Sequence, residues 1–503
     1  MARATSAARA VAGISSLLIA APLTGSIRAQ GFRITGISLA NYVELRPVAE
    51  DSVPDSLTVG TGSQRQSAAG PVTCLPGQAQ CYFYRSLGLN HTIPLTQDVE
   101  VTGWGFGEGI SVYAHLRANA NGGGVSELWT RENEHFNSLA AYVEVDRSRW
   151  TARAGRQWIT SQLGLNNFDG VSLALRTPAR LVVEGLAGWS LIQGMSEPPT
   201  NDDLAAADVL PPDKRGIVLG ASLRWRPPPD ALPLAIGVEY QREIRTDRAG
   251  LYADRIAAEG AYTAHDISIL GDIQADLASS AINDLRVRVS RRFAHGISGS
   301  IEGVHSTPFF PLWTIWGVFA PVGYNEARAG ATWASVDDDR SLSLSGGYRQ
   351  YQDTHTGVGF LPLRDNGWTV IGVGAWRVLR SLDLTGSYRR DIGFGASKSD
   401  GNLGLRWNRG DAWWIGVTAS ALQTLYEYSI ANGYVSGASL DAGVPLTFGV
   451  RLDAEAGVYR HIGANTSSPL DWSQRRALVR AEWYVGRDPG MPAVQSTSQG
   501  RPQ

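Results

Sequence analysis

The chain of 503 residues is almost without lysine, since Lys214 and Lys398 are the only lysines among its 45 basic residues. Its formal net charge is −2, so it lacks the basic field that nucleic acid binding requires, and we expect no nucleic acid partner. Two cysteines are too few for a disulfide scaffold or a cysteine-based metal site. A hydrophobic content of 43% at this low net charge also excludes a disordered chain.

Long apolar runs are missing as well. Beyond residue 30 the longest apolar stretch, Pro308 to Gly323, is interrupted by prolines, which excludes transmembrane helices. The N-terminus instead has Arg3 and Arg9 ahead of a short apolar stretch from Val11 to Ala21. This pattern predicts a signal peptide over residues 1–29 and therefore an exported protein.

Alternation of apolar and polar residues is what the sequence has in abundance. From Ile282 to His295, apolar Leu285, Val287 and Val289 alternate with arginine and serine. The pattern recurs in many runs of ten to fourteen residues, which predicts long β-strands. A soluble sandwich has strands of about five or six residues, whereas a tilted strand needs about nine to eleven to cross a bilayer. The length favours a transmembrane β-barrel.

Tryptophans mark the ends of several runs, as in the aromatic girdles of membrane barrels. The girdle positions that we expect are Trp150, Trp225, Trp368, Trp413 and Trp483.

Ten tight turns separate these runs, and longer links lie between the resulting hairpins. The turns are Gly103–Glu108, Asp146–Arg149, Thr177–Ala179, Pro227–Ala231, Ala264–Asp266, Ala294–Gly296, Asp337–Asp339, Leu379–Ser381, Arg409–Asp411 and Pro445–Thr447. Ten hairpins, one first strand and one last strand predict an all-β, antiparallel, up-and-down barrel of about 22 strands, with 18 or 20 as the alternatives. The barrel should occupy residues 30–487.

The whole pattern resembles Gram-negative outer-membrane β-barrels, a likeness that extends over almost the entire chain. Within it, Ala154–Gln157 followed by Phe168–Val171 resembles a segment of substrate-selective porins and alginate-export-type barrels. The final strand, with Trp483 and Tyr484, is similar to the signal that the barrel-assembly machinery recognises. Residues 488–503 depart from the family pattern, and we expect a disordered periplasmic tail there. The resemblance implies location in the outer membrane, with its lipid and the assembly machinery as partners.

Inward-facing charges are the candidate functional residues of such a barrel. Acidic and basic side chains should lie on neighbouring strands in two groups, either as a structural ladder of ion pairs or as a charged pore lining. The first group is Asp272, Asp276, Arg286, Arg288, Arg292 and Glu302, and the second is Arg451, Asp453, Glu455, Arg480 and Glu482. Because both signs are mixed, weak charge selectivity is expected.

The segment Thr307 to Tyr324 interrupts the alternation with five phenylalanine and tryptophan residues and three prolines. Its rings are candidates for an aromatic lid or constriction in the lumen, although packing on the rim or in the outer leaflet is slightly favoured. These residues are Phe309, Phe310, Trp313, Trp316 and Phe319.

Cys74 and Cys81 lie in the longest link, residues 47–91. In an oxidising compartment they can pair only with each other, which predicts a disulfide hairpin in a long first outer loop. This loop is also a candidate cap or partial plug of the barrel opening.

Known catalytic motifs are missing, including the Gly-x-Ser-x-Gly elbow and the His-Glu-x-x-His zinc motif. We therefore expect no enzyme, cofactor or metal. An energised transporter would need an N-terminal plug, yet strand alternation begins at Arg33. The sequence favours a porin-like channel for passive diffusion of small hydrophilic solutes. The alternative is a non-conducting structural, assembly or surface-binding barrel.

Overall fold

The structure is a computed structural model that describes residues 31–45, 48–62, 64–68, 70–74, 77, 79–86, 88–123, 136–191, 216–228, 232–244, 250–307, 309, 322–352, 365–393, 397–410, 412–425, 433–446, 449–463 and 471–487. The predicted signal peptide and C-terminal tail lie outside these residues. No helix in the described part of the chain is long and apolar enough to cross a bilayer.

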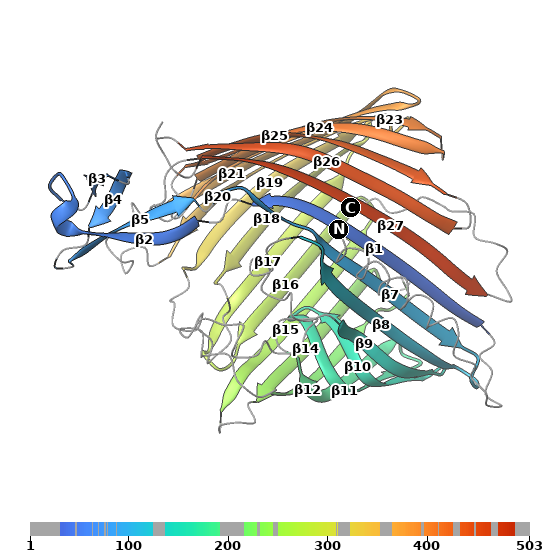
Figure 1. Ribbon diagram of the computed structural model, residues 1–503. Helices are drawn as coiled ribbons and strands as arrows, with labels where there is room; N and C mark the ends of the chain where they lie inside the picture. The colour runs from blue at the N-terminus through green and yellow to red at the C-terminus, as the bar shows by residue number, and fades with distance from the viewer. Residues whose placement is uncertain are drawn as a thin grey trace.

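Nearly all of the described chain is β-strand. The wall strands are β1 (Gly31–Leu45), β6 (Asn90–Thr92), β7 (Pro94–Trp104), β8 (Ile110–Asn121), β9 (Phe136–Asp146), β10 (Trp150–Ser161), β11 (Gly164–Arg176), β12 (Leu181–Ser190), β13 (Ile217–Trp225), β14 (Leu234–Ile244), β15 (Leu251–Ala264), β16 (Ile267–Asp276), β17 (Ala281–Arg292), β18 (Ile297–Ser306), β19 (Tyr324–Ala334), β20 (Arg340–Tyr351), β21 (Asn366–Leu379), β22 (Leu382–Ile392), β23 (Ser397–Arg409), β24 (Trp413–Leu425), β25 (Gly433–Pro445), β26 (Val450–Gly463) and β27 (Trp472–Arg487). Each pairs antiparallel with its neighbours in sequence, and the wall appears as one continuous sheet in Figure 1.

The first and last strands close the barrel. β1 pairs with β27 on one side, from Phe32 opposite Arg487 to Val43 opposite Arg476, and with β6 and β7 on the other side. Because β6 and β7 follow one another along β1, the 23 hydrogen-bonded segments make 22 wall strands. The predicted all-β barrel of 22 strands is confirmed.

The two ends of the barrel differ in their connections. All ten predicted tight turns join consecutive wall strands at the end where β1 begins and β27 ends. Left-handed backbone makes them compact, as at His295 and Gly296 between β17 and β18, with φ of 61° and 71°. Short turns mark the periplasmic side of such barrels and longer loops the other side, so the opposite end is the outer one.

The wall has one apolar and one polar face. On β17, Leu285, Val287 and Val289 are exposed on the outward face, while Arg286 and Arg288 alternate with them on the lumenal face. The strand register places the five predicted girdle tryptophans on the same outward face. Apolar residues can remain exposed there because lipid, not water, surrounds that face.

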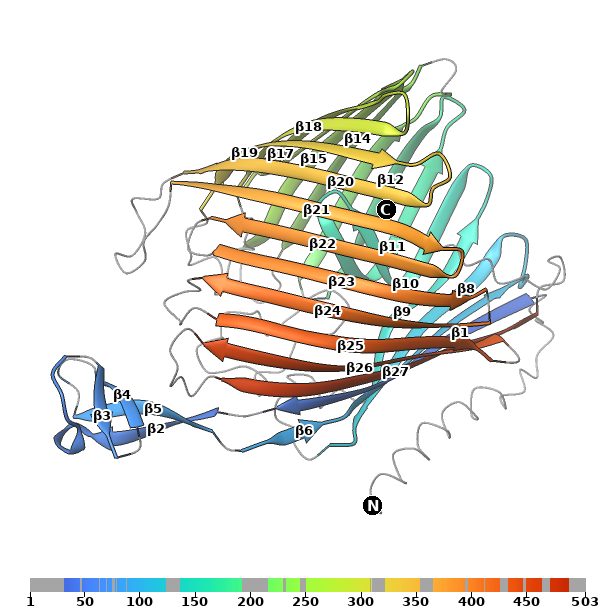
Figure 2. The same cartoon turned by 90° about the horizontal axis from the view of Figure 1, so that it is seen from above.

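A second, smaller sheet departs from the barrel between β1 and β6. It consists of β2 (Val48–Pro54), β3 (Gln64–Ser67), β4 (Gly70–Cys74) and β5 (Gln80–Ser86), in the order β2-β5-β4-β3, with a 3-10 turn at Asp55–Leu57. Figures 1 and 2 both show it projecting beyond the outer end of the wall instead of lying across the opening.

The core of this sheet contains a disulfide between Cys74 and Cys81, which are opposite residues of β4 and β5. Both are buried together with Val72, and Val53 and Phe83 pack against them. Asp55 lies near the two sulfur atoms. Because those sulfur atoms are bonded to each other, they are not available as thiolate metal ligands.

Candidate functional site

One hairpin of the wall leaves its neighbours and enters the lumen. The ladder between β10 and β9 ends at Arg156, and the ladder between β11 and β12 begins only at Phe168. Between these points, the strand ladder from Trp158 to Asn167 pairs residues of this hairpin only, in the part of the chain described, and the Asn167 carbonyl oxygen also accepts a hydrogen bond from the Leu191 backbone N–H at 2.8 Å. We call residues 157–168 the inner hairpin; its two-residue turn is Gln162 and Leu163.

Two opposed glycines permit this departure. Gly155 has a φ of +129°, and a Cβ there would lie 2.2 Å from the Ala141 carbonyl oxygen. Gly170 pairs with Gly155, and a Cβ at Gly170 would lie 2.1 Å from the Ala187 carbonyl oxygen. Any side chain at either position would collide with a neighbouring backbone, so glycine is required where the hairpin leaves the wall.

The tip of the inner hairpin binds to the lumenal face of β14 and β15. The Gln162 backbone N–H donates to Glu239 Oε2 at 3.1 Å, and its side-chain amide bonds to Glu259. Arg255 donates to the Leu163 carbonyl oxygen at 2.8 Å. These contacts hold the hairpin against β14 and β15, which are the third and fourth strands after β11 around the wall.

Polar side chains also anchor the base of the inner hairpin. Gln157 is fully buried and accepts a hydrogen bond of 2.7 Å from Ser172. On the other side, the Trp158 ring packs edge-on against His115 of β8, with 6.0 Å between centroids. His115 lies 3.9 Å from Glu100 and 4.0 Å from Asp98. The hairpin therefore connects distant parts of the lumenal face.

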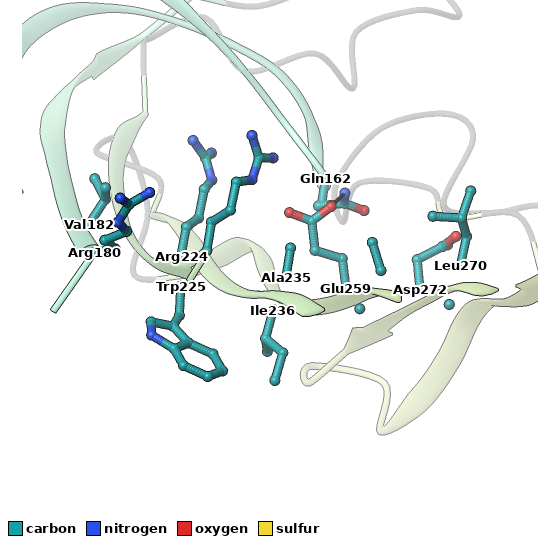
Figure 3. A pocket seen from close by; sticks show the side chains of 14 residues that line it. Gln162, Arg180, Val182, Arg224, Trp225, Ala235, Ile236, Glu259, Leu270 and Asp272 are labelled. Carbon is teal, nitrogen blue, oxygen red and sulfur yellow. Dashed lines mark hydrogen bonds between the residues drawn. The ribbon is translucent and has the colours of Figure 1, made fainter. Parts of the chain in front are cut away.

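A recess of about 510 Å³ lies beside the hairpin tip (Figure 3). Three guanidinium groups, from Arg180, Arg224 and Arg226, line one part of it. Glu259 and Asp272 line the other part, together with Gln162. Groups of opposite sign thus face the same small volume.

A second recess of about 360 Å³ shares Gln162 and Asp272 with the first. Phe309 lines it, and the guanidinium carbon of Arg255 lies 4.1 Å from the centre of the Phe309 ring. This one ring of the predicted aromatic lid therefore lies on the lumenal face, not on the rim or in the leaflet. Phe310, Trp313, Trp316 and Phe319 lie outside the described residues.

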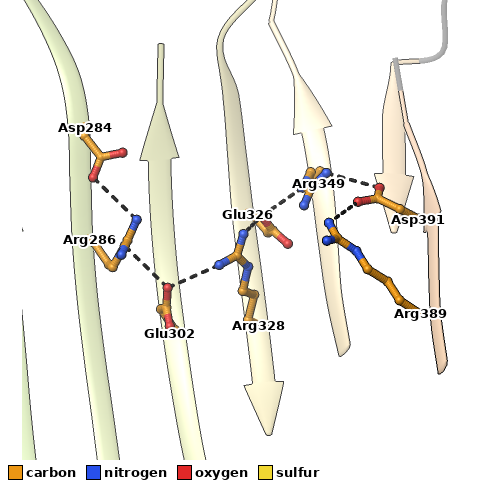
Figure 4. A network of polar contacts seen from close by, with 8 residues as sticks. All are labelled: Asp284, Arg286, Glu302, Glu326, Arg328, Arg349, Arg389 and Asp391. Carbon is orange, nitrogen blue, oxygen red and sulfur yellow. Dashed lines mark hydrogen bonds and ion pairs between the residues drawn. The ribbon is translucent and has the colours of Figure 1, made fainter. Parts of the chain in front are cut away.

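An ion-pair network crosses the lumenal face of β17 to β22 (Figure 4). Glu302 lies 3.5 Å from both Arg286 and Arg328. Glu326, whose side chain is fully buried, accepts hydrogen bonds from Arg328 at 2.7 Å and Arg349 at 2.9 Å. Next to β21, Arg349 and Arg389 meet Asp391 at 3.3 and 3.0 Å. The network spans six strands with alternating charge.

The register places every member of the first predicted group on the lumenal face, with different surroundings. Arg286 and Glu302 belong to the network, and Asp272 lines both recesses. Arg288 and Arg292 are exposed. Asp276 differs from the prediction of a pore-lining residue, because it is 6% exposed and bonds to Ala278 N and Ser279 Oγ in the β16–β17 turn.

The second predicted group faces the lumen from β26 and β27. Arg451 is opposite Glu482, and Asp453 is opposite Arg480. Arg451 also pairs with Asp453 at 3.0 Å along its own strand, and Arg480 pairs with Glu482. Glu455 lies opposite Leu478. These pairs are partly exposed, in contrast to the buried Glu326.

Sequence reasoning missed the inner hairpin and the centre of the network. The glycines that release the hairpin lie within the segment noted for its resemblance to substrate-selective porins, so a signal was present. Glu326, Arg349 and Asp391 each stand on a different strand, and their proximity follows from the register alone. No motif within one strand marks them.

Comparison with known proteins gives only distant structural likeness. No protein-family model and no curated protein sequence matches the chain. Among solved structures, OccAB1 of Acinetobacter baumannii is similar at 11% identity and a TM-score of 0.38, covering 92% of this chain and 99% of that one. OpdK, an outer membrane protein of Pseudomonas aeruginosa, gives 9% identity and a TM-score of 0.36, with 90% and 99% covered. The siderophore receptor PirA of Pseudomonas aeruginosa gives 9% identity and 0.41, with 90% and 80% covered.

The closed wall and its apolar outer face determine the location of the protein. Closed barrels satisfy all backbone groups of a lipid-exposed sheet, and the outward side chains here are apolar between the two ends. The chain therefore has the architecture of a transmembrane β-barrel.

Proposed function

We propose that the barrel is a channel for passive diffusion of small hydrophilic solutes, narrowed by the inner hairpin. The supporting observation is a large wall with a polar lumenal face. Twenty-two strands spaced about 4.8 Å apart and tilted by about 40° enclose a backbone circle roughly 40 Å across. Wall side chains alone do not fill such a width, so water and solutes can occupy the centre.

The inner hairpin is the element that sets the width of the path. It crosses the lumenal face of several strands and is fixed at its tip by Glu239, Glu259 and Arg255. Both recesses adjoin Gln162. A solute that passes the hairpin therefore meets arginine and carboxylate groups in succession.

Weak charge selectivity follows from the alternation of these groups. In the network, Glu302, Glu326 and Asp391 alternate with arginines, and the second group has the same mixture. The fields of neighbouring charges of opposite sign oppose each other and largely cancel beyond the separation of the pair, and salt screens what remains over about 8 to 10 Å. The lumen then attracts neither anions nor cations strongly.

A surface-binding barrel is the second candidate. The projecting sheet β2–β5, with its disulfide core, supports this alternative because it extends beyond the outer end of the wall. It would bind a partner whether or not the barrel conducts.

Single-channel recording in planar bilayers tests the proposal. The purified protein should give ohmic current steps with a small reversal potential in a salt gradient. A variant in which Asn-Gly replaces residues 158–167 should give larger steps, because the hairpin no longer narrows the path. A variant without residues 48–86 serves as the control and should keep the original step size. If none of the three proteins gives current although the heat-dependent gel shift shows that each is folded, the surface-binding alternative is favoured.

A further inference from the structure

A small cationic cluster lies on the lipid-facing side of the wall, at the outer end of β25, β26 and β27. Arg460 stands directly opposite Ser436 of β25 and Ser473 of β27. Arg475 is the diagonal neighbour of Arg460, because Arg475 is opposite Val458. Diagonal pairs in a sheet have side chains roughly 7 to 8 Å apart, which long side chains can bridge.

The register shows that this cluster faces outward. Arg460 follows Ala454, Ala456 and Val458 at intervals of two residues, while Glu455 and Tyr459 point to the lumen. Arg460 and Arg475 are each within a few residues of the outer end of their strand. Both are exposed, and the Arg475 side chain is 76% exposed.

Within the described ranges, Arg460 lacks the carboxylate partner that another outward arginine of the wall has. On β14, outward Arg242 has Asp254 of β15 at 3.8 Å. Among the described residues of β22 to β27, by contrast, no carboxylate faces outward, and Asp471 immediately before β27 is the nearest along the chain. No ion pair is found for Arg460 within the described part of the chain.

Arg475 has one carboxylate partner among the residues described, at about the same distance as that between Arg242 and Asp254. Its guanidinium lies 3.9 Å from Glu44 of β1. Glu44 is 8% exposed and already accepts hydrogen bonds from the Arg475 backbone N–H at 3.0 Å and the Tyr42 hydroxyl at 3.2 Å. The exposed guanidinium therefore keeps most of its donors free for another acceptor.

The lipid environment determines what that acceptor is. A guanidinium on the lipid face is costly near the midplane of the bilayer, but the cost nearly disappears close to the interface. At the outer end it meets lipid headgroups, and two guanidiniums with two hydroxyls match a phosphate group, which accepts paired N–H donors. Charge complementarity thus indicates an anionic headgroup of the outer leaflet.

We propose that Arg460 and Arg475, with Ser436 and Ser473, bind a phosphate group of a phosphorylated glycolipid in the outer leaflet. The site lies outside the lumen, so it does not depend on whether the barrel conducts.

Binding of purified lipid A in detergent tests this proposal. The delipidated protein is titrated with bis-phosphorylated lipid A, and bound lipid is counted by native mass spectrometry. The wild-type protein should bind saturably, and Arg460→Ser/Arg475→Ser should weaken binding by about tenfold or more, since charged hydrogen bonds contribute about 1.5 to 3 kcal/mol each. Arg242→Ser, which removes an outward arginine whose carboxylate partner is as near as that of Arg475, is the matched control and should bind as the wild type does.

Three results would overturn the proposal: equal binding by the double variant, equal binding of dephosphorylated lipid A, or equal binding of phosphatidylglycerol. The last would assign the cluster to anionic phospholipid. All variants should keep the heat-dependent gel shift and the single-channel current of the wild type, because the substituted side chains point away from the lumen. Arg390→Ser, four strands away on β22, shows whether binding is specific to the cluster or common to all outward arginines of this face.

Discussion

The wall from β8 to β15 and the wall from β22 to β27 are built from the same alternating strands, yet their lumenal faces differ. Around the inner hairpin the side chains of Gln157, Phe168 and Leu139 are almost completely buried. On β22 to β27 the lumenal ion pairs are partly exposed, as at Arg480 and Glu482. The difference arises because the inner hairpin covers part of the first region. The comparison teaches that lumenal side chains of these two regions are buried where another segment packs against the wall.

The largest effect that we expect comes from the glycines that release the hairpin. Gly155→Val places a branched side chain at a φ of +129° and against the Ala141 carbonyl oxygen, so the barrel should fail to assemble or lose its inner hairpin. Gly386→Val on β22 is the control, because a Cβ there meets its nearest neighbour at 3.7 Å. The heat-dependent gel shift and single-channel step size measure both outcomes. Normal assembly and normal step size for Gly155→Val would contradict the role of this glycine.

A second effect concerns the two faces of one strand. Val287→Arg puts a guanidinium on the lipid face near the centre of β17 and should destabilise the barrel by about 2 to 4 kcal/mol. Arg288→Val, one residue along on the lumenal face, should leave assembly unchanged. Urea unfolding in lipid vesicles, followed by tryptophan fluorescence, gives the free energies. Equal tolerance of the two substitutions would mean that the faces are assigned in reverse.

A smaller effect separates buried from exposed ion pairs. Arg349→Gln removes one of two arginines that hold the buried Glu326 carboxylate and should cost about 1.5 to 3 kcal/mol. Arg480→Gln removes a partly exposed partner of Glu482 and should cost about 0 to 1 kcal/mol. The same unfolding measurement compares them, and similar losses for both would remove the distinction between the two regions.

The smallest change is expected in ion selectivity. Replacing Arg286, Arg288 and Arg292 with serine removes fixed positive charge and should shift the reversal potential toward cations while current persists. The shift in reversal potential should be modest, because Arg288 and Arg292 are exposed to solvent and the charge of Arg286 is offset by the neighbouring Glu302. A bi-ionic salt gradient measures it. A shift toward anions, or no shift, would show that these arginines lie away from the ion path.

The sequence predicts the wall well because each strand carries its own evidence. Alternation assigns the face of Val287 and Arg288 locally, and turn residues such as His295 and Gly296 locate the hairpins, which yields the strand number. The second sheet was harder to predict from the sequence, because its short strands provide little alternation. For residues 47–91 the sequence predicted a loop with a disulfide hairpin. The structure instead has a four-stranded sheet over residues 48–86, with Cys74 and Cys81 in its core.

The lumenal site depends on relations between distant strands, which one sequence does not encode locally. Gln162 meets Glu239 and Glu259 from 77 and 97 residues away. Alternation in β10 and β11 looks the same whether the hairpin continues the wall or bends inward, and only the opposed Gly155 and Gly170 distinguish the two. Asp276 shows the converse limit, because inward polarity alone does not separate a pore-lining carboxylate from one that accepts hydrogen bonds in a turn.

The pairing of β1 with β27 has a consequence for the order in which the barrel can form. We call the ladder between β1 and β27 the seam; it places Phe32 opposite Arg487. Apart from the seam and the pairing of β1 with β6 and β7, every wall ladder joins strands that are consecutive in the chain. Consecutive hairpins can form early at low loop entropy, but this closing step must wait for the last strand and bring together residues more than 400 positions apart. The seam is an ordinary antiparallel ladder, and the beginning of β1 lies beside the end of β27. A linker could therefore join these two strands while the chain is cut at another outer loop, and every strand would keep its neighbours. A circular permutant would then keep the architecture and change only which contact is made last.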